Sequence, residues 1–229
     1  MKDLYTPREF KKIMADGRAA EEETFLLNEH ELSIIVNEHL LMKLVCTNQN
    51  LDELVLGRLM TSGIIDRAED VDRIIFSKYK NVAAVFLNID KEFDKRGLKK
   101  LPKMKYENKW IFELAERFKQ DTEIHEITSC THSCMLWMNG EVVFSCEDIG
   151  RHNAIDKAVG YALIKRIPLS ECIVYTSGRV PVDMAEKVIA AGIPVLASKS
   201  VPTYEAVNLA HDYGLVIIGN ARPDSLKVF

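Results

Sequence analysis

The sequence predicts an α/β protein, and three features of the chain indicate this class. From residue 109 onwards, short apolar segments typical of buried strands alternate with amphipathic segments typical of helices. Strands that alternate with helices form a parallel sheet with right-handed crossovers and with helices on both faces. The pair Asn139-Gly140 lies between two apolar segments and is typical of a tight β-hairpin. A strongly charged stretch at residues 90–105 separates this region from a smaller one before it.

The first region, residues 1–105, is predicted to be a smaller α+β domain that ends in a charged linker or mobile loop. Residues 1–23 are polar and mixed in charge, which favours a short helix followed by a flexible lead. The remaining elements are expected to be two hairpin strands, one helix closed by a glycine and two further strands: residues 31–36, 40–45, 50–62, 73–76 and 82–87. We place the domain boundary near residue 105.

The second region, residues 106–229, is predicted to hold nine elements in the order α-β-β-α-β-α-β-α-β. They are residues 109–119, 135–138, 141–144, 153–165, 172–176, 182–191, 194–197, 203–212 and 215–218. This order resembles the cytidine-deaminase-like fold, which implies a three-layer α/β/α domain.

Composition excludes several classes of protein. The formal charge of −4 over 229 residues gives no general attraction to nucleic acid or to an anionic membrane. No apolar stretch approaches the roughly 20 residues that span a bilayer, and residues 1–7 lack a secretion signal. The five cysteines are an odd number without CxxC spacing, which predicts reduced thiols in a cytoplasmic protein and disfavours a zinc site.

Polar side chains gather where three predicted strands lead into helices. These junctions are residues 147–152, 176–179 and 198–203. Ligands of α/β sheets bind beyond the carboxyl ends of the strands, where helix N-termini favour anions. We therefore expect a site for phosphates, pyrophosphates or the polar edge of a pterin, with these candidate binding residues: Arg151, His152, Ser177, Gly178, Arg179, Ser198, Lys199 and Thr203.

Each junction also has a plain structural interpretation. Residues 147–152 fit a capped helix start with surface charges, and Ser177-Gly178-Arg179 fits an ordinary turn. Thr203 fits an N-cap whose side chain serves only its own helix. The three junctions together favour a ligand site more than any one of them does alone.

A cluster of Cys130, His132 and Cys134 precedes the predicted hairpin. These residues fit metal ligands, a nucleophile with its base, or buried thiols. Zinc is disfavoured because a fourth ligand and the usual spacing are missing. Zinc deaminases need His-x-Glu and Pro-Cys-x-x-Cys motifs, and the corresponding helix starts at residues 151–154 and 177–181 cannot build that site.

Several motifs resemble the FdhD family, and they follow the family's order from about residue 24 to the C-terminus. The stretch EDIGRHNAIDK at residues 147–157 is the most specific of them. The others are Cys46-Thr47, Asp52-Glu53-Leu54, Ser62-Gly63-Ile64-Ile65, Cys130-Thr131-His132, Ser177-Gly178-Arg179, Gly192-Ile193-Pro194-Val195-Leu196, Pro202-Thr203 and Ala206-Val207.

The resemblance implies a formate dehydrogenase accessory protein, a sulfurtransferase-type sulfur carrier. Such proteins carry sulfur as a cysteine persulfide from a cysteine desulfurase to the molybdenum cofactor, before this cofactor enters formate dehydrogenase. It further implies a homodimer that binds the bis(molybdopterin guanine dinucleotide) form of the cofactor. The family's cofactor segment corresponds here to residues 220–225, namely Asn220, Ala221, Arg222, Pro223, Asp224 and Ser225.

One departure from the family divides the functional hypotheses. Typical members carry sulfur on a Cys-Gly-x-Cys-Gly loop between the two domains, and the matching residues 90–105 contain no cysteine. Under the first hypothesis, Cys130 or Cys134 carries the sulfur and His132 favours the thiolate. Under the second, the protein is a chaperone that binds the cofactor or a guanine nucleotide without covalent chemistry. A third, a small-molecule hydrolase or transferase, lacks the Gly-x-Ser-x-Gly and Gly-rich phosphate motifs of such enzymes.

Overall fold

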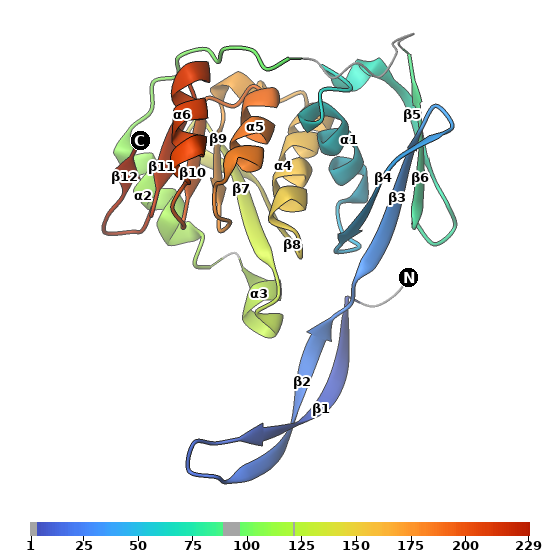
Figure 1. The fold of residues 1–229 in the computed structure, drawn as a ribbon, viewed down its shortest axis with the longest axis vertical. Helices are drawn as coiled ribbons and strands as arrows, with labels where there is room; N and C mark the ends of the chain where they lie inside the picture. The colour runs from blue at the N-terminus through green and yellow to red at the C-terminus, as the bar shows by residue number, and fades with distance from the viewer. Residues whose placement is uncertain (1–3, 89–96, 121) are drawn as a thin grey trace.

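Two β-sheets lie side by side in the computed structural model of the protein (Figure 1). The structure describes residues 4–88, 97–120 and 122–229. The larger sheet has six strands and belongs to the C-terminal half, and the smaller sheet has four strands and belongs to the N-terminal half. An α/β architecture is thus confirmed. The first part of the predicted linker, residues 90–96, falls outside the described residues.

The larger sheet has the strand order β12-β11-β10-β9-β7-β8. Its strands are β7 (His132–Met138), β8 (Glu141–Asp148), β9 (Ile173–Thr176), β10 (Val195–Ser198), β11 (Val216–Gly219) and β12 (Lys227–Val228). Strands β9, β10 and β11 pair in parallel, as predicted. The predicted hairpin adds an antiparallel strand to this sheet, because β7 runs antiparallel to both β8 and β9.

The reason for the reversed strand is the hairpin turn between β7 and β8. Asn139 and Gly140 have φ angles of 53° and 92°. Positive φ at both central residues is what a tight hairpin turn needs, so the predicted turn is confirmed. The first strand of this hairpin joins β9, and it therefore enters the sheet against the direction of the parallel strands.

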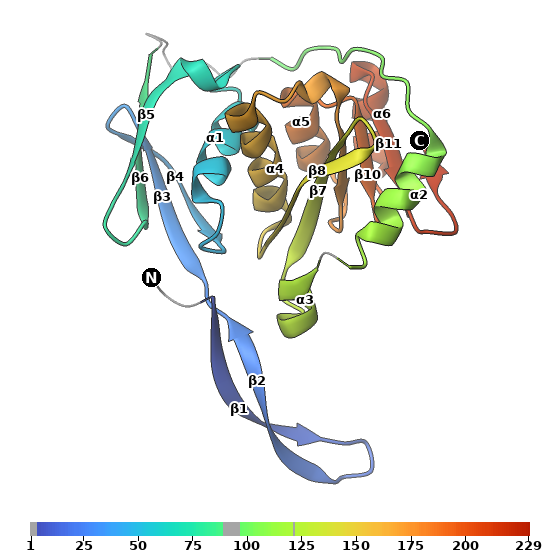
Figure 2. The ribbon, with the colours of Figure 1, turned by 180° about the vertical axis from the view of Figure 1, so that it is seen from behind.

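Helices cover the larger sheet on both faces. Three of them, α4 (Arg151–Lys165), α5 (Val182–Ala190) and α6 (Tyr204–Tyr213), share one core with side chains of β7 and β9 such as Leu136 and Val174. The opposite face is covered by α2 (Asn108–Arg117), which packs on Trp137 and Tyr175 (Figure 2). A short helix that the sequence did not predict, α3 (Glu123–Thr128), precedes β7.

The smaller sheet has the strand order β4-β3-β6-β5. Its strands are β3 (His30–Val36), β4 (His39–Cys46), β5 (Val71–Phe76) and β6 (Val82–Leu87), and α1 (Leu51–Thr61) packs against it. These are the strands and the helix that the sequence predicts. Two short 3-10 helices, Ala68–Asp70 and Leu169–Glu171, complete the regular elements. The domain boundary near residue 105 stays a prediction.

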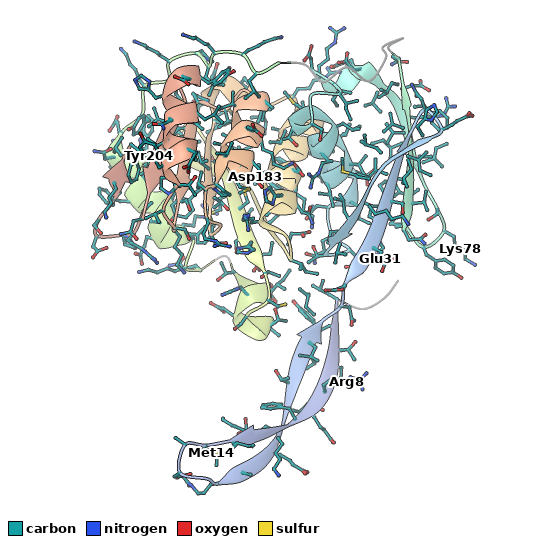
Figure 3. All side chains as sticks on the ribbon, viewed as in Figure 1. Arg8, Met14, Glu31, Lys78, Asp183 and Tyr204 are labelled. Atoms are coloured by element: carbon teal, nitrogen blue, oxygen red, sulfur yellow. The ribbon has the colours of Figure 1, made fainter. Side chains whose placement is uncertain are left out.

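Residues 4–23 do not form the predicted helix. Strands β1 (Tyr5–Ile13) and β2 (Ala19–Leu27) form an antiparallel hairpin that extends away from both sheets (Figure 3). The turn contains Gly17 at φ 85°, and Lys12 on β1 pairs with Glu22 on β2 at 3.0 Å. Opposite charges on facing strands and a glycine turn favour the hairpin. The mixed polar composition of these residues does not by itself reveal this pairing.

The two halves meet where α1 packs against α4, a contact that we call the seam. A Cβ on Gly57 would lie 1.7 Å from the carbonyl oxygen of Asp156, and one on Gly160 would lie 1.8 Å from that of Glu53. Both glycines therefore permit a backbone approach that no other residue allows. The seam fixes the two sheets against each other.

Buried ion pairs also stabilise the seam. Asp148 and Lys157 are fully buried and lie 2.7 Å apart, and the Thr47 N–H donates to the same carboxylate. Asp156, also fully buried, accepts from Lys187 at 2.7 Å and lies 2.8 Å from Arg58 Nε. Buried charges are tolerated when they are paired and hydrogen-bonded in this way. Within the described residues, no helix is long and apolar enough to span a membrane.

Candidate functional site

The three predicted junctions lie together at one edge of the larger sheet. In the sheet register, His132 lies opposite Asp148, and Thr176 lies beside both Cys134 and Ser198. The ends of β8, β9 and β10 therefore share the edge at which β7 begins. We call this edge the rim and define it by residues 147–152, 176–179 and 198–203.

Hydrogen bonds and close packing connect the junctions of the rim. The Ser198 hydroxyl donates to the Gly178 carbonyl at 2.7 Å, and the Lys199 N–H donates to the Thr176 carbonyl at 3.0 Å. A Cβ on Gly178 would lie 2.9 Å from Cβ of Arg151. The cations at residues 151, 179 and 199 thus belong to one continuous surface.

A pocket of about 270 Å³ opens at the rim between α2, α3 and the ends of the parallel strands. Its polar lining includes hydroxyls and cationic side chains, and its apolar lining includes two aromatic rings. The lining residues are Ala115, Phe118, Lys119, Thr122, His125, Thr131, Ser133, Tyr175, Ser177, Lys199, Ala221, Arg222 and Pro223. Such a pocket suits a planar polar ring that carries negative charge.

Five of the predicted binding residues line this pocket: Ser177, Lys199, Ala221, Arg222 and Pro223. They come from the loops after β9, β10 and β11. Tyr175 holds the last of these loops, because its hydroxyl donates to the Ala221 carbonyl at 2.7 Å. Burial raises the pKa of Tyr175 to about 12, so the phenol stays protonated and keeps this bond.

Four other predicted residues form hydrogen bonds to groups of the protein itself: Ser198, Thr203, Asp224 and Ser225. Ser198 is fully buried, donates to Gly178 and accepts from the Ser200 N–H, so its hydroxyl serves the rim's own structure. Thr203 caps α6 by accepting from the Ala206 N–H at 3.3 Å. The Ser225 hydroxyl donates to the Asp224 carboxylate at 3.4 Å. Ser198 and Thr203 thus have hydrogen-bonding roles within the protein, and binding of a ligand by these four residues stays a prediction.

Arg151, His152 and Arg179 belong to the rim but do not line the pocket. The Nε atom of Arg151 is buried and has no hydrogen-bond partner among the described residues. His152 Nε2 lies 2.8 Å from the carboxylate of Asp183, which is labelled on α5 in Figure 3. Burial lowers the pKa of His152 although Asp183 opposes this effect. A buried donor without a partner is costly, so an added acceptor at Arg151 Nε would be stabilising.

The sequence missed the pocket residues that come from α2 and α3. Phe118 and Lys119 follow the end of α2, and Thr122 and His125 belong to the start of α3. Phe118 packs on Tyr175 with ring centroids 4.7 Å apart, which forms the apolar wall. The helical pattern of residues 109–119 indicated α2. No local signal, however, shows that the last turn of this helix lies near the ends of the parallel strands.

The five cysteines differ sharply in exposure. Cys130 is exposed, whereas the other four are buried. Burial raises the pKa of Cys46, Cys146 and Cys172 to about 12 and that of Cys134 well above its ordinary value. A buried thiol with a raised pKa is a poor nucleophile. Of the two cysteines that the sequence proposed as sulfur carriers, only Cys130 has suitable surroundings.

His132 begins β7 and faces the rim. Its Nδ1 lies 3.2 Å from the Ser177 hydroxyl oxygen. Burial lowers the pKa of His132, and the nearby Arg151 guanidinium lowers it further. The imidazole is therefore neutral at pH 7, and it can accept a proton but cannot supply the positive charge that would stabilise a thiolate.

Two other features of the molecule bear on the site. Among the described residues, no three His, Cys, Asp or Glu side chains gather closely enough to hold a metal ion. A second cavity, of about 780 Å³, lies between the two halves and is lined by Gly97–Pro102 and by the ends of α4 and α5. It contains none of the predicted site residues.

Fold and site together define an α/β protein with a cation-lined pocket beside an exposed thiol. The chain belongs to the FdhD/NarQ family, whose model matches residues 27–103 and 85–229. It is 31% identical to the sulfur carrier protein FdhD of Sulfolobus acidocaldarius, over 93% of this chain and 92% of the relative. It is 27% identical to the protein of the same name from Listeria innocua, over 99% and 97%.

A solved structure shows the same fold. It is a candidate formate dehydrogenase accessory protein from Desulfotalea psychrophila, which matches with a TM-score of 0.87 and 26% identity. The match covers 99% of this chain and 97% of the other. The family and the α/β fold that the sequence predicts are therefore confirmed.

Proposed function

We propose that this protein is a sulfur carrier in which Cys130 holds a persulfide beside the pocket at the rim. The observation that carries the proposal is the position of this thiol. It is the exposed one of the chain's five cysteines, and the next residue, Thr131, lines the pocket. The relatives named sulfur carrier protein FdhD support the same role.

Loading of Cys130 is a thiol–persulfide exchange. The Cys130 thiolate attacks the outer sulfur of a persulfide on a cysteine desulfurase, and a new S–S bond forms. The S–S bond within the donor breaks, and the donor cysteine leaves as a thiolate that takes up a proton. The exchange needs no oxidant or reductant. An exposed thiol suits this step, because the donor is itself a protein.

We propose that the pocket, with its volume of about 270 Å³, receives one planar ring and the adjoining phosphate of the cargo, the bis(molybdopterin guanine dinucleotide) form of the molybdenum cofactor, while the rest of the cargo lies along the rim. Pterin and guanine are planar polar rings, and the pyrophosphates that join them are anionic. Lys119, Lys199 and Arg222 line the pocket, and Arg151 belongs to the rim and has an unpartnered buried Nε. Guanidinium and ammonium groups bind phosphate by charge-assisted hydrogen bonds. Delivery would break the S–S bond of the Cys130 persulfide and release Cys130 as a thiolate. The outer sulfur would pass to the cargo, which in its reduced state would supply the two electrons that turn this sulfur into sulfide, before the cargo goes to formate dehydrogenase.

The proposed partners follow from this role. They are a cysteine desulfurase as donor, formate dehydrogenase as recipient and a second copy of the chain in a homodimer, all in the cytoplasm. The accessory-protein description of the Desulfotalea structure supports the link to formate dehydrogenase.

Mass spectrometry tests the loading step directly. The protein is incubated with a cysteine desulfurase and cysteine, and we expect the mass of one sulfur atom to appear on the peptide that contains Cys130. The Cys130→Ser variant should gain none, while its melting temperature stays unchanged because the side chain is exposed. Sulfur on another cysteine, or on none, contradicts the proposal.

A second candidate is a chaperone that binds the cofactor without covalent chemistry. The rim favours it as well, because the pocket and Arg151 need no thiol in order to bind an anion. A Cys130→Ser, Cys134→Ser double variant that still restores formate dehydrogenase activity would support this role and exclude sulfur transfer through either candidate cysteine.

A further inference from the structure

Glu147 lies at the end of β8, next to the pocket but not in its lining. Its side chain is 7% exposed. A carboxylate this deeply buried is costly unless hydrogen bonds compensate it, and none of the ion pairs found among the described residues includes Glu147. The donors that satisfy it all come from one stretch of chain, residues 124–133.

Four hydrogen bonds reach the two carboxylate oxygens of Glu147. The N–H groups of Ile124 and His125 donate at 2.7 and 2.9 Å. The Thr131 hydroxyl donates at 2.8 Å and the Ser133 hydroxyl at 3.5 Å. The first two donors belong to the first turn of α3, and the other two flank the start of β7.

The helix that Glu147 caps is too short to persist by itself. α3 has 6 residues, and no side chain from its own N-cap residue, Thr122, accepts its first N–H groups. Isolated helices of this length are unstable in water, and their first N–H groups need acceptors. Glu147 supplies those acceptors from a different strand, and its negative charge suits the positive end of the helix.

The stretch fixed by Glu147 contains both parts of the proposed site. Cys130 lies within it, and three of the four donor residues also line the pocket: His125, Thr131 and Ser133. His125 Nδ1 lies 3.0 Å from the Thr131 carbonyl oxygen, which closes the loop on itself. One carboxylate thus sets the position of the thiol relative to the pocket.

We propose that Glu147 is the positioning residue that holds Cys130 against the pocket. This inference rests on the proposed sulfur-carrier function of Cys130. Loading needs only an exposed thiol, whereas delivery needs the thiol close to a cargo in the pocket. Glu147 therefore contributes to delivery and not to loading.

The test uses Glu147→Gln in the full-length chain. Glutamine keeps the size of the side chain, but one oxygen becomes an NH₂ group, which cannot accept from a backbone N–H. We expect hydrogen exchange to rise at least about tenfold at the Ile124 or the His125 amide, whichever faces the NH₂ group, because that amide loses its acceptor. Persulfide loading of Cys130 should stay within about twofold, and the kcat of sulfur delivery should fall by about tenfold or more, as displacements of about 1 Å cause larger losses.

Glu123→Gln is the matched control. Glu123 is an exposed carboxylate at the start of the same helix, so the variant removes the same charge without touching the anchor. This variant should leave hydrogen exchange at the Ile124 and His125 amides, persulfide loading of Cys130 and the kcat of sulfur delivery unchanged. If Glu147→Gln does not fold, Thr131→Val removes one of the four bonds and should give the same pattern with a smaller loss of delivery.

The outcomes separate this inference from the proposed function. Unchanged exchange at Ile124 and His125 overturns it, because another group must then hold the stretch. Delivery that is unaffected, or that falls together with loading, overturns it as well. If wild-type protein takes up no sulfur, the proposed function fails, and the exchange rates still decide whether Glu147 holds this stretch.

Discussion

The seam and the rim both contain charged side chains from one motif, residues 147–157, but their surroundings differ. In the seam, Asp148, Asp156 and Lys157 are fully buried and each has an oppositely charged partner within 3 Å. At the rim, Lys199 and Arg179 are exposed, and Arg151 keeps a buried Nε without a partner. A single stretch of sequence therefore contributes to the fold through Asp148, Asp156 and Lys157, and to the candidate site through Arg151.

The difference shows how to separate structural charges from functional ones. Removing a partner from a buried pair leaves a charge in a medium that cannot solvate it. Removing an exposed cation costs the fold little, so such residues are free to serve a ligand. The seam and the rim should respond in opposite ways to similar substitutions, and four experiments examine this contrast.

The largest effect is expected from Gly57→Ala in the seam. The new Cβ would lie 1.7 Å from the Asp156 carbonyl oxygen, so α1 and α4 must separate. We expect a loss of more than about 3 kcal/mol in the free energy of unfolding, at the upper end for overpacked sites. Chemical denaturation measures it, with Gly97→Ala as control, since nothing lies within 4 Å of a Cβ at Gly97. Equal stability of the two variants would contradict the close helix contact.

The next effect is expected from Lys157→Met. The substitution leaves the buried Asp148 carboxylate without its ammonium partner, which typically costs about 3 to 5 kcal/mol. Lys199→Met at the rim is the matched control, and as an exposed substitution it should change the unfolding free energy by less than about 0.5 kcal/mol. Denaturation curves that shift by similar amounts would remove the distinction between seam and rim.

Ligand binding should respond in the opposite order. Arg222→Met should weaken the binding of guanosine diphosphate, used as a probe of the pocket, by about five- to tenfold, as the loss of one charge-assisted contact implies. Lys227→Met removes an exposed cation on β12 that does not line the pocket, and it should leave affinity unchanged. Titration calorimetry compares the variants. Equal losses would mean that general charge, and not the pocket, attracts the nucleotide.

The smallest effect concerns the pH dependence of stability. Burial lowers the pKa of His132 below its ordinary 6.5, so the unfolded chain binds the proton more tightly than the folded one. Stability due to this residue is complete above pH 6.5 and is lost as pH falls through the folded pKa. His132→Gln should make the decline in unfolding free energy between pH 7.5 and 5.5 less steep, as measured with urea. An unchanged slope would show that His132 is not held neutral at the rim.

Local patterns predicted most of the regular elements. The alternating apolar segments after residue 109 indicated α2, α4, α5, α6 and the parallel strands, and Asn139-Gly140 indicated the β7–β8 hairpin. These signals are local, because side-chain periodicity and positive φ angles depend on a few consecutive residues. Helix α3 was missed because it depends on the distant Glu147 carboxylate, and the N-terminal hairpin was missed because its mostly exposed strands lack the apolar pattern of buried strands.

The candidate site was predicted in outline but not in the role of each residue. The ends of β9 and β10 were expected to form an anion site, and Ser177 and Lys199 line the pocket there. Ser198 has the same chemistry as Ser177, yet it is fully buried and bonded within the rim. Ser177 and Ser198 are the same type of residue, so only the direction in which the fold points each side chain distinguishes a pocket residue from a structural one.

The sequence by itself determined the family, the α/β class and the strand ends at which polar groups collect, because motifs and periodicity are properties of neighbouring residues. The tertiary structure decided which groups remain free. It buried Cys134 and left Cys130 exposed, and it turned Glu147 and Asp148 towards donors of the protein itself. Exposure and pairing depend on segments up to about a hundred residues apart, such as Thr47 and Asp148, which no local pattern connects.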